Sequence, residues 1–366
     1  HADRASVDPR VAGDDGLAGL RGDVQEVAVV EDADQDLVHV VAGVVGVRHD
    51  LVQLEVARGQ LGLQARVDDR RIVPRVGGQE AQVVADVLEG GRFVLDDLVD
   101  VAALGLDVVR LFCSYDGTFP NRSPNPADAS QLAELQKMVL TCDAELGLAF
   151  DGDGDRVAFV DGSGAWQPAD RVFVLLVDRA LRQRPGAAVV YDQKSSTIVP
   201  EAIAAAGGRA IRERSGFAHI KRRLLAEEAT LAGEISGHYF YAALGGDDGL
   251  YAACDLLAEL DYRGETLVQA LAGVPTYPIT PEIRVPADAA QARAVITELL
   301  TTFAGQHIDR TDGVRVEFAD GWALARESVT EPVITLRFEA QTPSRLEAIQ
   351  AAVRAASPTL QVIWRG

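Results

Sequence analysis

Three aspartates stand at every second position in a short glycine-containing segment. Asp151, Asp153 and Asp155 alternate with two glycines, and Arg156 follows them directly. Glycine adopts backbone angles that other residues avoid, so the segment can curl and bring the three carboxylates together. Oxygen ligands of this kind suit Mg²⁺, which keeps open positions for phosphate oxygens. The segment therefore predicts a Mg²⁺ site formed by Asp151, Asp153 and Asp155, with Arg156 beside it to hold a phosphate.

Other interpretations start from the same acidic segment. A calcium-binding hand fits poorly, because Arg156 stands where its sixth-position glycine belongs and Gly162 where its bidentate glutamate belongs. An aspartyl phosphatase would use Asp151 as a nucleophile at the end of a strand. A solvated Asp-Gly turn without any ligand is the alternative that involves no chemistry. Residues elsewhere in the chain have to decide between these interpretations.

A second loop combines a carboxylate, a hydroxyl and an imidazole. Glu234, Ser236 and His238 alternate with other residues, and Gly233 and Gly237 accompany them. Glu234 can accept hydrogen bonds from neighbouring sugar hydroxyls, and His238 could serve as a general base near neutral pH. A histidine in a loop can also have a purely structural role, so this loop needs support from other residues.

Several cations and hydroxyls could bind a phosphate group. Arg326, Ser328 and Thr330 lie on a turn between two predicted strands, and Arg337 lies on the second of these strands. Guanidinium groups, hydroxyls and backbone N–H groups together can form a phosphate cradle, although an ordinary polar hairpin would have the same composition.

Lysine is rare in this chain, which makes the position of each lysine informative. Besides Lys137, Lys194 follows a predicted strand end, and Lys221 lies near the start of a predicted helix together with His219. A hydroxyl, a histidine and a lysine at a helix start could reach a phosphate or a sugar. We therefore include Lys194, His219 and Lys221 among the candidate binding residues.

Alternating strands and helices position these loops. The patterns predict strands at 107–112, 146–150, 187–191 and 209–212, and helices at 128–140, 172–181, 198–206 and 218–229. This order is typical of α/β domains with mixed or parallel sheets. After a linker near 274–278 we expect an antiparallel C-terminal α+β domain, with strands at 282–285, 314–318, 322–326 and 333–338 and helices at 289–303 and 344–356.

The first hundred residues differ from the rest in composition. Before Leu104 the chain has no Lys, Asn, Thr, Tyr, Trp, Met or Cys, Ser6 is its only serine, and Phe93 is its only aromatic residue. A folded domain normally uses polar turn residues and aromatic core residues. Residues 1–103 are therefore left unassigned. They are either a Val-rich, low-complexity domain or a wrong-frame translation of GC-rich DNA in place of a first domain.

The bulk composition excludes some partners. The net charge is −20 and the pI about 4.7, so the chain repels nucleic acid and anionic membranes. Three cysteines without CxxC spacing fit a reduced cytoplasmic protein. We see no signal peptide and no apolar stretch long enough to cross a bilayer.

Taken in order, these loops resemble the α-D-phosphohexomutase family of phosphomannomutases and phosphoglucomutases. The resemblance covers about residues 104–366 and does not include a recognisable first domain. The segment 116–121 with Asn125-Pro126 is similar to the family's segment before the metal loop. The acidic loop, the loop 234–238 and the loop after Arg326 match the family's metal, sugar and phosphate loops. The family has four domains around one cleft. The resemblance thus implies a partial domain two at 104–164, domain three at 165–274 and domain four at 277–366.

The resemblance also implies an activity. Family members interconvert hexose 1-phosphate and hexose 6-phosphate, of mannose or glucose, through a phosphoserine and a 1,6-bisphosphate. It assigns Mg²⁺ to the three aspartates and catalytic roles to Arg156 and His238. The implied substrate-binding set is Lys194, His219, Lys221, Glu234, Ser236, Arg326, Ser328, Thr330 and Arg337. The family's serine at the position of Ser236 marks enzymes that accept both sugars, and we expect a monomer or a dimer.

The chain departs from the family pattern at three places. The family's Thr-Ala-Ser-His-Asn-Pro loop is absent, and Ser6 lacks such neighbours. Val329 stands where the family usually has Asn, and Phe217 and His219 rearrange the usual order before Lys221. Without the nucleophilic serine, the alternative to a mutase is an inactive fragment that binds sugar phosphate and Mg²⁺.

Overall fold

The computed structural model describes residues 107–113, 118–328 and 331–364 in full, and six short strands before residue 107 as backbone. Contacts divide the chain into two units, His1–Arg66 and Val67–Gly366. The first unit contains an antiparallel sheet of order β1-β2-β3. The six early strands are β1 (Val27–Glu31), β2 (Leu37–Ala42), β3 (Leu54–Ala57), β4 (Arg75–Val76), β5 (Gln79–Glu80) and β6 (Gln82–Asp86).

The second unit begins with a mixed five-stranded sheet of order β10-β9-β8-β6-β7. Strands β6, β7 and β8 are parallel, whereas β9 and β10 join the sheet antiparallel. All five residues of β8 and of β9 are buried. Its elements are β7 (Asp107–Leu111), the 3₁₀ turn η1 (Ala129–Leu132), α2 (Ala133–Cys142), β8 (Leu146–Phe150), β9 (Val157–Asp161) and β10 (Trp166–Gln167).

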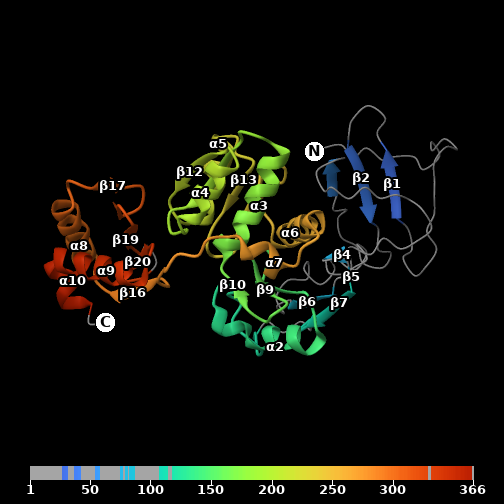
Figure 1. The fold of residues 1–366 in the computed structure, drawn as a ribbon, viewed down its shortest axis with the longest axis horizontal. Helices are drawn as coiled ribbons and strands as arrows, with labels where there is room; N and C mark the ends of the chain where they lie inside the picture. Colours follow the sequence, from blue (N-terminus) through green and yellow to red (C-terminus); the bar gives the residue numbers. More distant parts are fainter. Residues whose placement is uncertain are drawn as a thin grey trace, which may run out of the picture. The chain divides into compact units, whose positions relative to one another are not determined.

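The next sheet has the order β12-β11-β13-β14-β15 and carries helices on both faces (Figure 1). Strands β12, β11 and β13 are parallel, and β14 and β15 are antiparallel additions. The elements are α3 (Ala169–Gln183), β11 (Ala188–Asp192), α4 (Ile198–Ala205), β12 (Arg209–Glu213), α5 (Phe217–Ala226), β13 (Leu231–Gly233), β14 (Tyr239–Tyr241), β15 (Gly246–Asp247), α6 (Gly249–Arg263) and α7 (Leu267–Ala272).

One hydrophobic core joins these two sheets. Phe150 and Phe159 from the first sheet belong to the same buried cluster as Val189 and Tyr191 from the second. Helices α3, α4, α6 and α7 contribute most of the other members of this cluster, while the opposite face of the second sheet packs on α5 through Ile220. The two sheets therefore stabilise each other through shared apolar burial.

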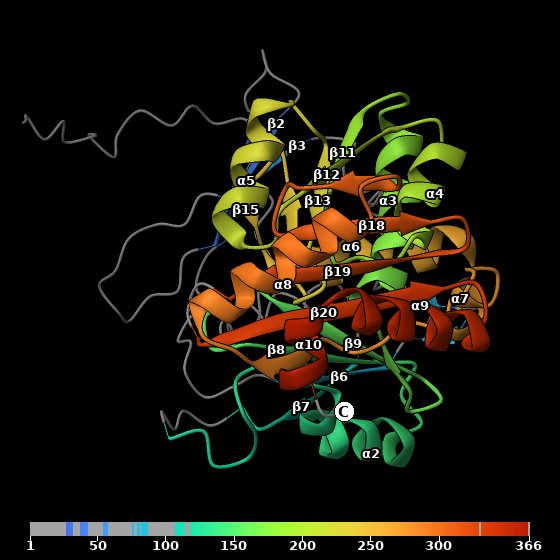
Figure 2. The same cartoon turned by 90° about the vertical axis from the view of Figure 1, so that its left-hand side faces the viewer.

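The C-terminal part is an antiparallel sheet of order β16-β20-β19-β18-β17 with its own core. Helices α8, α9 and α10 cover one face of it (Figure 2). Residues alternate between the faces of a strand, so those next to the core positions lie on the other face. They include the charged residues Arg315, Arg326 and Arg337. The elements are β16 (Ile283–Pro286), α8 (Ala289–Thr302), β17 (His307–Asp309), β18 (Val314–Phe318), β19 (Gly321–Glu327), β20 (Val333–Ala340), α9 (Pro343–Ala356) and α10 (Pro358–Ile363).

The predicted fold class is confirmed. Mixed-sheet α/β domains precede a C-terminal α+β domain, and most predicted elements lie within a few residues of the observed ones. The helix predicted at 218–229 ends earlier, at Ala226, because Glu228 adopts a φ of 51° and the Ala229 amide turns back to Leu224 O. No helix in the described part of the chain is both long and apolar enough to cross a membrane.

Candidate functional site

The acidic loop begins directly after β8 and folds around Asp151. Asp151 is 1% exposed, and its Oδ1 accepts hydrogen bonds from the amides of Gly154 and Arg156 at 3.1 and 3.2 Å. Its Oδ2 accepts a hydrogen bond from Arg156 Nε at 2.6 Å. Gly154 has a φ of 77°, which the curl of the loop requires. Both oxygens therefore accept hydrogen bonds from the acidic loop itself, which fixes the orientation of the carboxylate.

The three aspartates converge as the sequence predicted. One ligand oxygen from each of Asp151, Asp153 and Asp155 lies within 4.8 Å of the others. Oδ1 of Asp155 is buried and accepts no hydrogen bond. Burial and the charge of Asp151 raise the pKa of Asp155 to about 7. A buried oxygen without a donor, among like charges, fits a hard cation, so the donor set suits a metal ion such as Mg²⁺.

Arg122 and Asn125 precede the acidic loop in the sequence, and both form hydrogen bonds with residues at or beside it. Arg122 is 6% exposed and donates from Nη2 to the carbonyl of Phe150 at 2.7 Å, next to Asp151. Asn125 accepts a hydrogen bond from Arg156 Nη1 at 3.2 Å. The end of β8 and the orientation of Arg156 are therefore both fixed by the segment that precedes α2.

The sugar loop pairs directly with the acidic loop. Arg156 and His238 form an antiparallel β-bridge, and the amide of Val157 donates to Gly237 O at 3.1 Å. Gly237 has a φ of 95°, and a Cβ on it would lie 2.9 Å from the carbonyl oxygen of Val157. Only glycine permits this approach. The two loops, 82 residues apart at Arg156 and His238 (238 − 156), thus form one site.

The first residue of helix α6 contacts the backbone of the acidic loop. The amide of this residue, Gly249, donates to the carbonyl of Gly154 at 3.0 Å. A Cβ on Gly249 would lie 2.7 Å from that oxygen and 2.8 Å from the backbone of Arg156. The preceding Asp248 caps the helix through a 2.7 Å bond from the Tyr251 amide.

His238 is held by a carboxylate that the sequence analysis did not single out. Its Nδ1 lies 2.6 Å from Oδ2 of Asp247 and 3.8 Å from Oδ1 of Asp155. Burial acts to lower the pKa of His238, but the hydrogen bond with Asp247 and the charges of Asp155 and Glu234 outweigh it and raise the pKa.

Glu234 belongs to the same tight turn as His238. The Glu234 amide donates to His238 O at 3.0 Å, and its own carbonyl accepts from Gly237. Burial and the charge of Asp192 raise the pKa of Glu234, against the effect of Lys194. A buried carboxylate beside a cation and an imidazole is suited to accept hydrogen bonds from a neutral polyhydroxyl ligand.

Phe217, not His219, contacts the sugar loop. The Phe217 ring centroid lies 6.1 Å from that of His238, and Nζ of Lys221 lies 5.5 Å from the Phe217 centroid. Phe217 is nevertheless 42% exposed. The ring of His219 is half-buried and lies near Arg222 of the same helix, with 3.5 Å between Nδ1 and Nη2. The structure thus joins Lys221 to His238 through an aromatic ring, and it does not bring His219 to them.

Lys194 and the phosphate loop meet at the charged face of the C-terminal sheet. Nζ of Lys194 lies 3.2 Å from Oε2 of Glu282, and Nε of Arg326 lies 2.9 Å from Oδ2 of Asp312. In the register of β19 and β20, Leu324 opposes Arg337 and Arg326 opposes Thr335, so Arg326 and Arg337 share one face. Ser328 accepts from the Glu331 amide at 3.3 Å. Thr330 lies outside the described residues.

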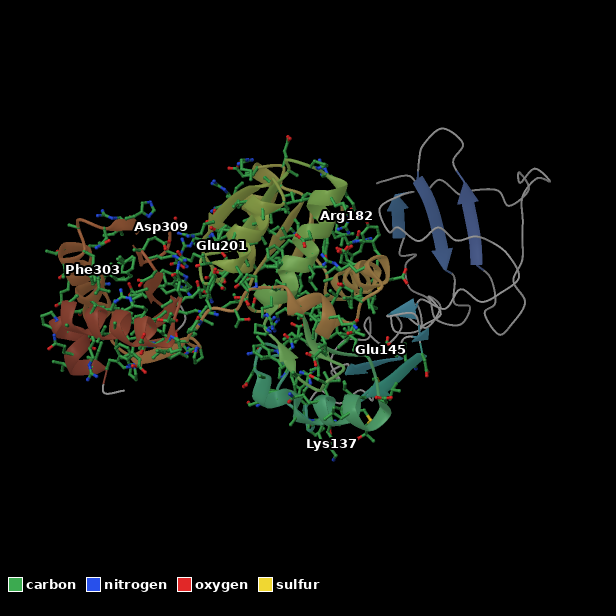
Figure 3. The ribbon with its side chains drawn as sticks, in the orientation of Figure 1. Lys137, Glu145, Arg182, Glu201, Phe303 and Asp309 are labelled. Atoms are coloured by element: carbon green, nitrogen blue, oxygen red, sulfur yellow. The ribbon has the colours of Figure 1, made fainter. Side chains whose placement is uncertain are left out.

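This charged face contacts the preceding α/β domain. Arg212 pairs with Asp309 at 3.2 Å and with Glu317 at 2.8 Å, and Arg315 donates to the carbonyl of Gln193. Figure 3 labels Asp309 on the C-terminal side of this boundary and Glu201 on the other side. The predicted phosphate-binding cations therefore lie on a polar interface and not on a free surface.

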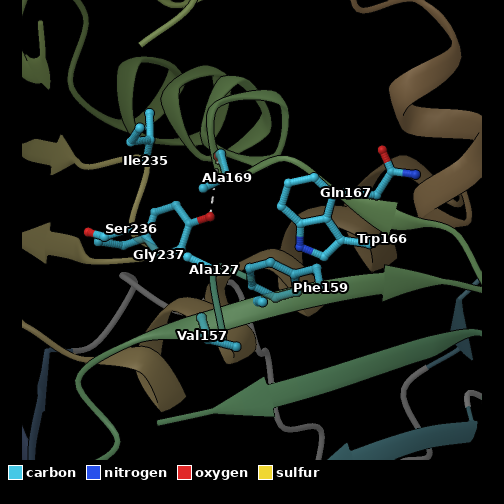
Figure 4. A pocket seen from close by; sticks show the side chains of 11 residues that line it. Ala127, Val157, Phe159, Trp166, Gln167, Ala169, Ile235, Ser236 and Gly237 are labelled. Atoms are coloured by element: carbon cyan, nitrogen blue, oxygen red, sulfur yellow. Dashed lines mark hydrogen bonds between the residues drawn. The ribbon is translucent and has the colours of Figure 1, made fainter. Parts of the chain in front are cut away.

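A small pocket lies between β9, β10 and the sugar loop (Figure 4). Phe159, Trp166 and Ile235 give it mainly apolar walls, and Tyr239 closes it by donating to the carbonyl of Ala169 at 3.3 Å. Ser236 is the member of the predicted substrate-binding set found in its lining. The charged candidate residues lie outside this lining, so the pocket is not the place where they would meet a ligand.

Family comparisons match the chain in three consecutive segments. The phosphoglucomutase/phosphomannomutase α/β/α domain II matches residues 66–164, the α/β/α domain III matches residues 168–277, and the C-terminal domain matches residues 282–356. The first match begins well before residue 104, where the composition changes, and it includes β6, which lies between β8 and β7 in the sheet β10-β9-β8-β6-β7. The recognisable sequence therefore extends upstream of the boundary predicted at 104.

Individual relatives agree with these matches. A phosphomannomutase/phosphoglucomutase of Pseudomonas putida is 36% identical over 280 residues, covering 75% of this chain and 60% of that protein. A phosphoglucomutase of Neisseria meningitidis is 40% identical over 270 residues, covering 71% and 58%. The crystal structure of a phosphoglucomutase/phosphomannomutase family protein from Burkholderia thailandensis has a TM-score of 0.69 at 35% identity, covering 76% and 61%. The chain spans about three-fifths of the length of these relatives.

Proposed function

Because the chain belongs to the phosphoglucomutase/phosphomannomutase family, we propose that it carries the metal, sugar and phosphate sites of a phosphohexose mutase. The proposed reaction interconverts the 1- and 6-phosphates of mannose or glucose through a phosphoserine and a 1,6-bisphosphate. The observation that carries this proposal is the β-bridge between Arg156 and His238. It unites the acidic loop, a candidate phosphate cation and a candidate base in one cluster.

Mg²⁺ is the proposed cofactor of the acidic loop. Asp151, Asp153 and Asp155 would hold it, and when bound it would neutralise charge on a transferring phosphoryl group. Two observations support this assignment: the three carboxylates converge, and Oδ1 of Asp155 is buried without a hydrogen-bond donor.

The other candidate residues are proposed to bind the reacting phosphoryl group, to transfer a proton and to bind the rest of the substrate. Arg156, fixed by Asp151 and Asn125, can contact the reacting phosphoryl group. His238 can take a proton from the attacking sugar hydroxyl, while Glu234 accepts hydrogen bonds from other hydroxyls. The proposed set for the non-reacting phosphate and the rest of the substrate is Lys194, His219, Lys221, Ser236, Arg326, Ser328, Thr330 and Arg337.

The presence or absence of a nucleophilic serine distinguishes a mutase from a binding protein without turnover. The serine loop of the family is absent from the given sequence, and the alternative is a sugar-phosphate and Mg²⁺ binding protein without turnover. Loss of an activated nucleophile costs about 10⁶-fold in a serine hydrolase. The cytoplasmic location remains a prediction, which rests on three cysteines without CxxC spacing.

Binding and turnover measured on the full chain would test the proposal. We expect glucose 1-phosphate to bind in a calorimeter in the presence of Mg²⁺, and the binding to weaken in Asp153→Asn. Asp143→Asn is the matched control, because Asp143 is a helix C-cap with a φ of 54°, a conformation that Asn tolerates. Turnover at about 1 to 10³ s⁻¹ would establish the mutase. Binding without turnover would establish the inactive alternative, and absence of both would reject the proposed function.

A further inference from the structure

Asp247 is a buried carboxylate fixed against the candidate base. Its side chain is 6% exposed, and its Oδ2 lies 2.6 Å from Nδ1 of His238. Strand β15 holds it in place, because Asp247 pairs with Phe240 across the β14–β15 ladder. The position is therefore set by backbone register and not by a mobile loop side chain.

Two aromatic rings restrict His238 as well. The centroid of Phe240 lies 5.8 Å and that of Phe217 6.1 Å from the imidazole centroid. Packing of this kind limits rotation of the ring. The carboxylate of Asp247 then decides which nitrogen carries the proton.

The chemistry of the contact fixes the tautomer. An ionised carboxylate only accepts hydrogen bonds, so Nδ1 of His238 must be the donor. A neutral imidazole has a single N–H, and Nε2 is therefore left with a free lone pair. Asp155 also lies near Nδ1, at 3.8 Å, but it belongs to the acidic set that would bind the cation. Asp247 is the carboxylate with no other assigned task.

We propose that Asp247 is a positioning residue that holds His238 as the Nδ1–H tautomer and leaves Nε2 to accept the proton of the sugar hydroxyl. This inference rests on the proposed function only for the identity of the hydroxyl. The proton would move from the hydroxyl oxygen to Nε2 while that oxygen forms its bond to the phosphorus of the proposed phosphoserine donor. The bond from phosphorus to the serine oxygen breaks, and that oxygen keeps the electron pair. His238 then becomes the imidazolium and Asp247 remains ionised.

Imidazole NMR on the full chain tests the tautomer directly. In ¹⁵N-histidine-labelled protein, at a pH where His238 is neutral, we expect an Nδ1–H pattern for His238, identified by its loss in His238→Gln. Asp247→Asn should change the pattern towards Nε2–H, because the Asn amide can donate to Nδ1. Asp248→Asn is the matched control. It alters the neighbouring residue but keeps a good helix N-cap, so the pattern should be unchanged.

An Nε2–H pattern in the wild-type protein, or an unchanged Nδ1–H pattern in Asp247→Asn, would overturn the inference. If the chain turns over hexose phosphate, Asp247→Asn should lower kcat about 10²-fold with KM nearly unchanged, which a merely structural residue would not do. An equal loss in Asp248→Asn, or a change in KM alone, would contradict the positioning role. The tautomer result stands without turnover, so failure of the proposed function and failure of this inference remain distinguishable.

Discussion

Lys194 and Glu282 form an ion pair between the segment that matches domain III and the segment that matches the C-terminal domain. The distance from Nζ to Oε2 is 3.2 Å, and only 12% of the lysine side chain and 27% of the glutamate side chain are exposed. Although burial acts to raise it, the pKa of Glu282 is lowered by Lys194, Arg326 and Arg284. Glu282 thus faces two cations that are proposed to bind phosphate.

We expect Glu282→Gln to tighten hexose-phosphate binding about three- to tenfold. A substrate phosphate has to compete with the carboxylate for Lys194 and Arg326, and the amide removes that competition. Calorimetric titration with glucose 1-phosphate measures the change. Glu227→Gln is the control, since Glu227 pairs with Arg209 away from these cations. Weaker binding in Glu282→Gln would mean that Glu282 holds Lys194 in its binding position instead of competing.

Mg²⁺ affinity should depend on pH around neutrality. The pKa of Asp155 is about 7, so below pH 7 a proton has to leave this carboxyl before Mg²⁺ binds. Affinity should fall by up to about tenfold per pH unit below pH 7 and reach a plateau above it. Titrations with Mg²⁺ at pH 6, 7 and 8 measure this dependence. In Asp155→Asn the affinity should be lower at every pH and nearly constant, whereas equal wild-type affinity at pH 6 and pH 8 would contradict the prediction.

Gly237→Ala should destabilise the protein more than Gly245→Ala. Both glycines have positive φ, at 95° and 64°, so both substitutions carry backbone strain of about 1–2 kcal/mol. A Cβ at Gly245 meets nothing within 4 Å, whereas one at Gly237 lies 2.9 Å from Val157 O. Urea denaturation should therefore give about 1–3 kcal/mol more loss in free energy of unfolding for Gly237→Ala. Equal losses would show that the loop moves freely away from Val157.

Phe217→Ala should weaken hexose-phosphate binding roughly three- to tenfold. The ring lies between Lys221 and His238, so a ligand that reaches both would cover it, and an aromatic contact contributes about 0.5–1.5 kcal/mol. Leu225→Ala is the control, because Leu225 is 54% exposed on the same helix. The prediction fails if the two variants bind equally well.

The acidic loop and most of the fold could be predicted from local sequence. Asp151, Asp153 and Asp155 converge because the glycines between them are local, and strands such as Leu146–Phe150 are continuous apolar runs. Helix α6 is harder to predict, since Asp255 and Glu259 interrupt its apolar face. Both are buried and paired with Arg179 of α3, Glu259 also with Arg182 and Arg263, and such long-range pairing leaves no periodic signal.

The partners of the predicted site residues could not be predicted in the same way. Asp247 follows two glycines and precedes Asp248, so its sequence suggests a turn and a helix cap, and its contact with His238 depends on the β14–β15 register. Phe217 reaches the site only because α5 packs beside β13, which no spacing rule encodes. The pairing of Lys194 with Glu282 joins residues of two domains. Each of these contacts is tertiary, while the motifs themselves are local.

The contact between Gly249 and Gly154 limits how this architecture can be rearranged. The proposed metal ligands lie in the segment that matches domain II, but the Gly249 amide that contacts their loop lies in the segment that matches domain III. A chimera that exchanged only the first of these segments would inherit all three aspartates without a guarantee of their geometry. Recombination that preserves the cation site has to transfer residues on both sides of the domain boundary together, so the two segments are expected to be inherited as one module.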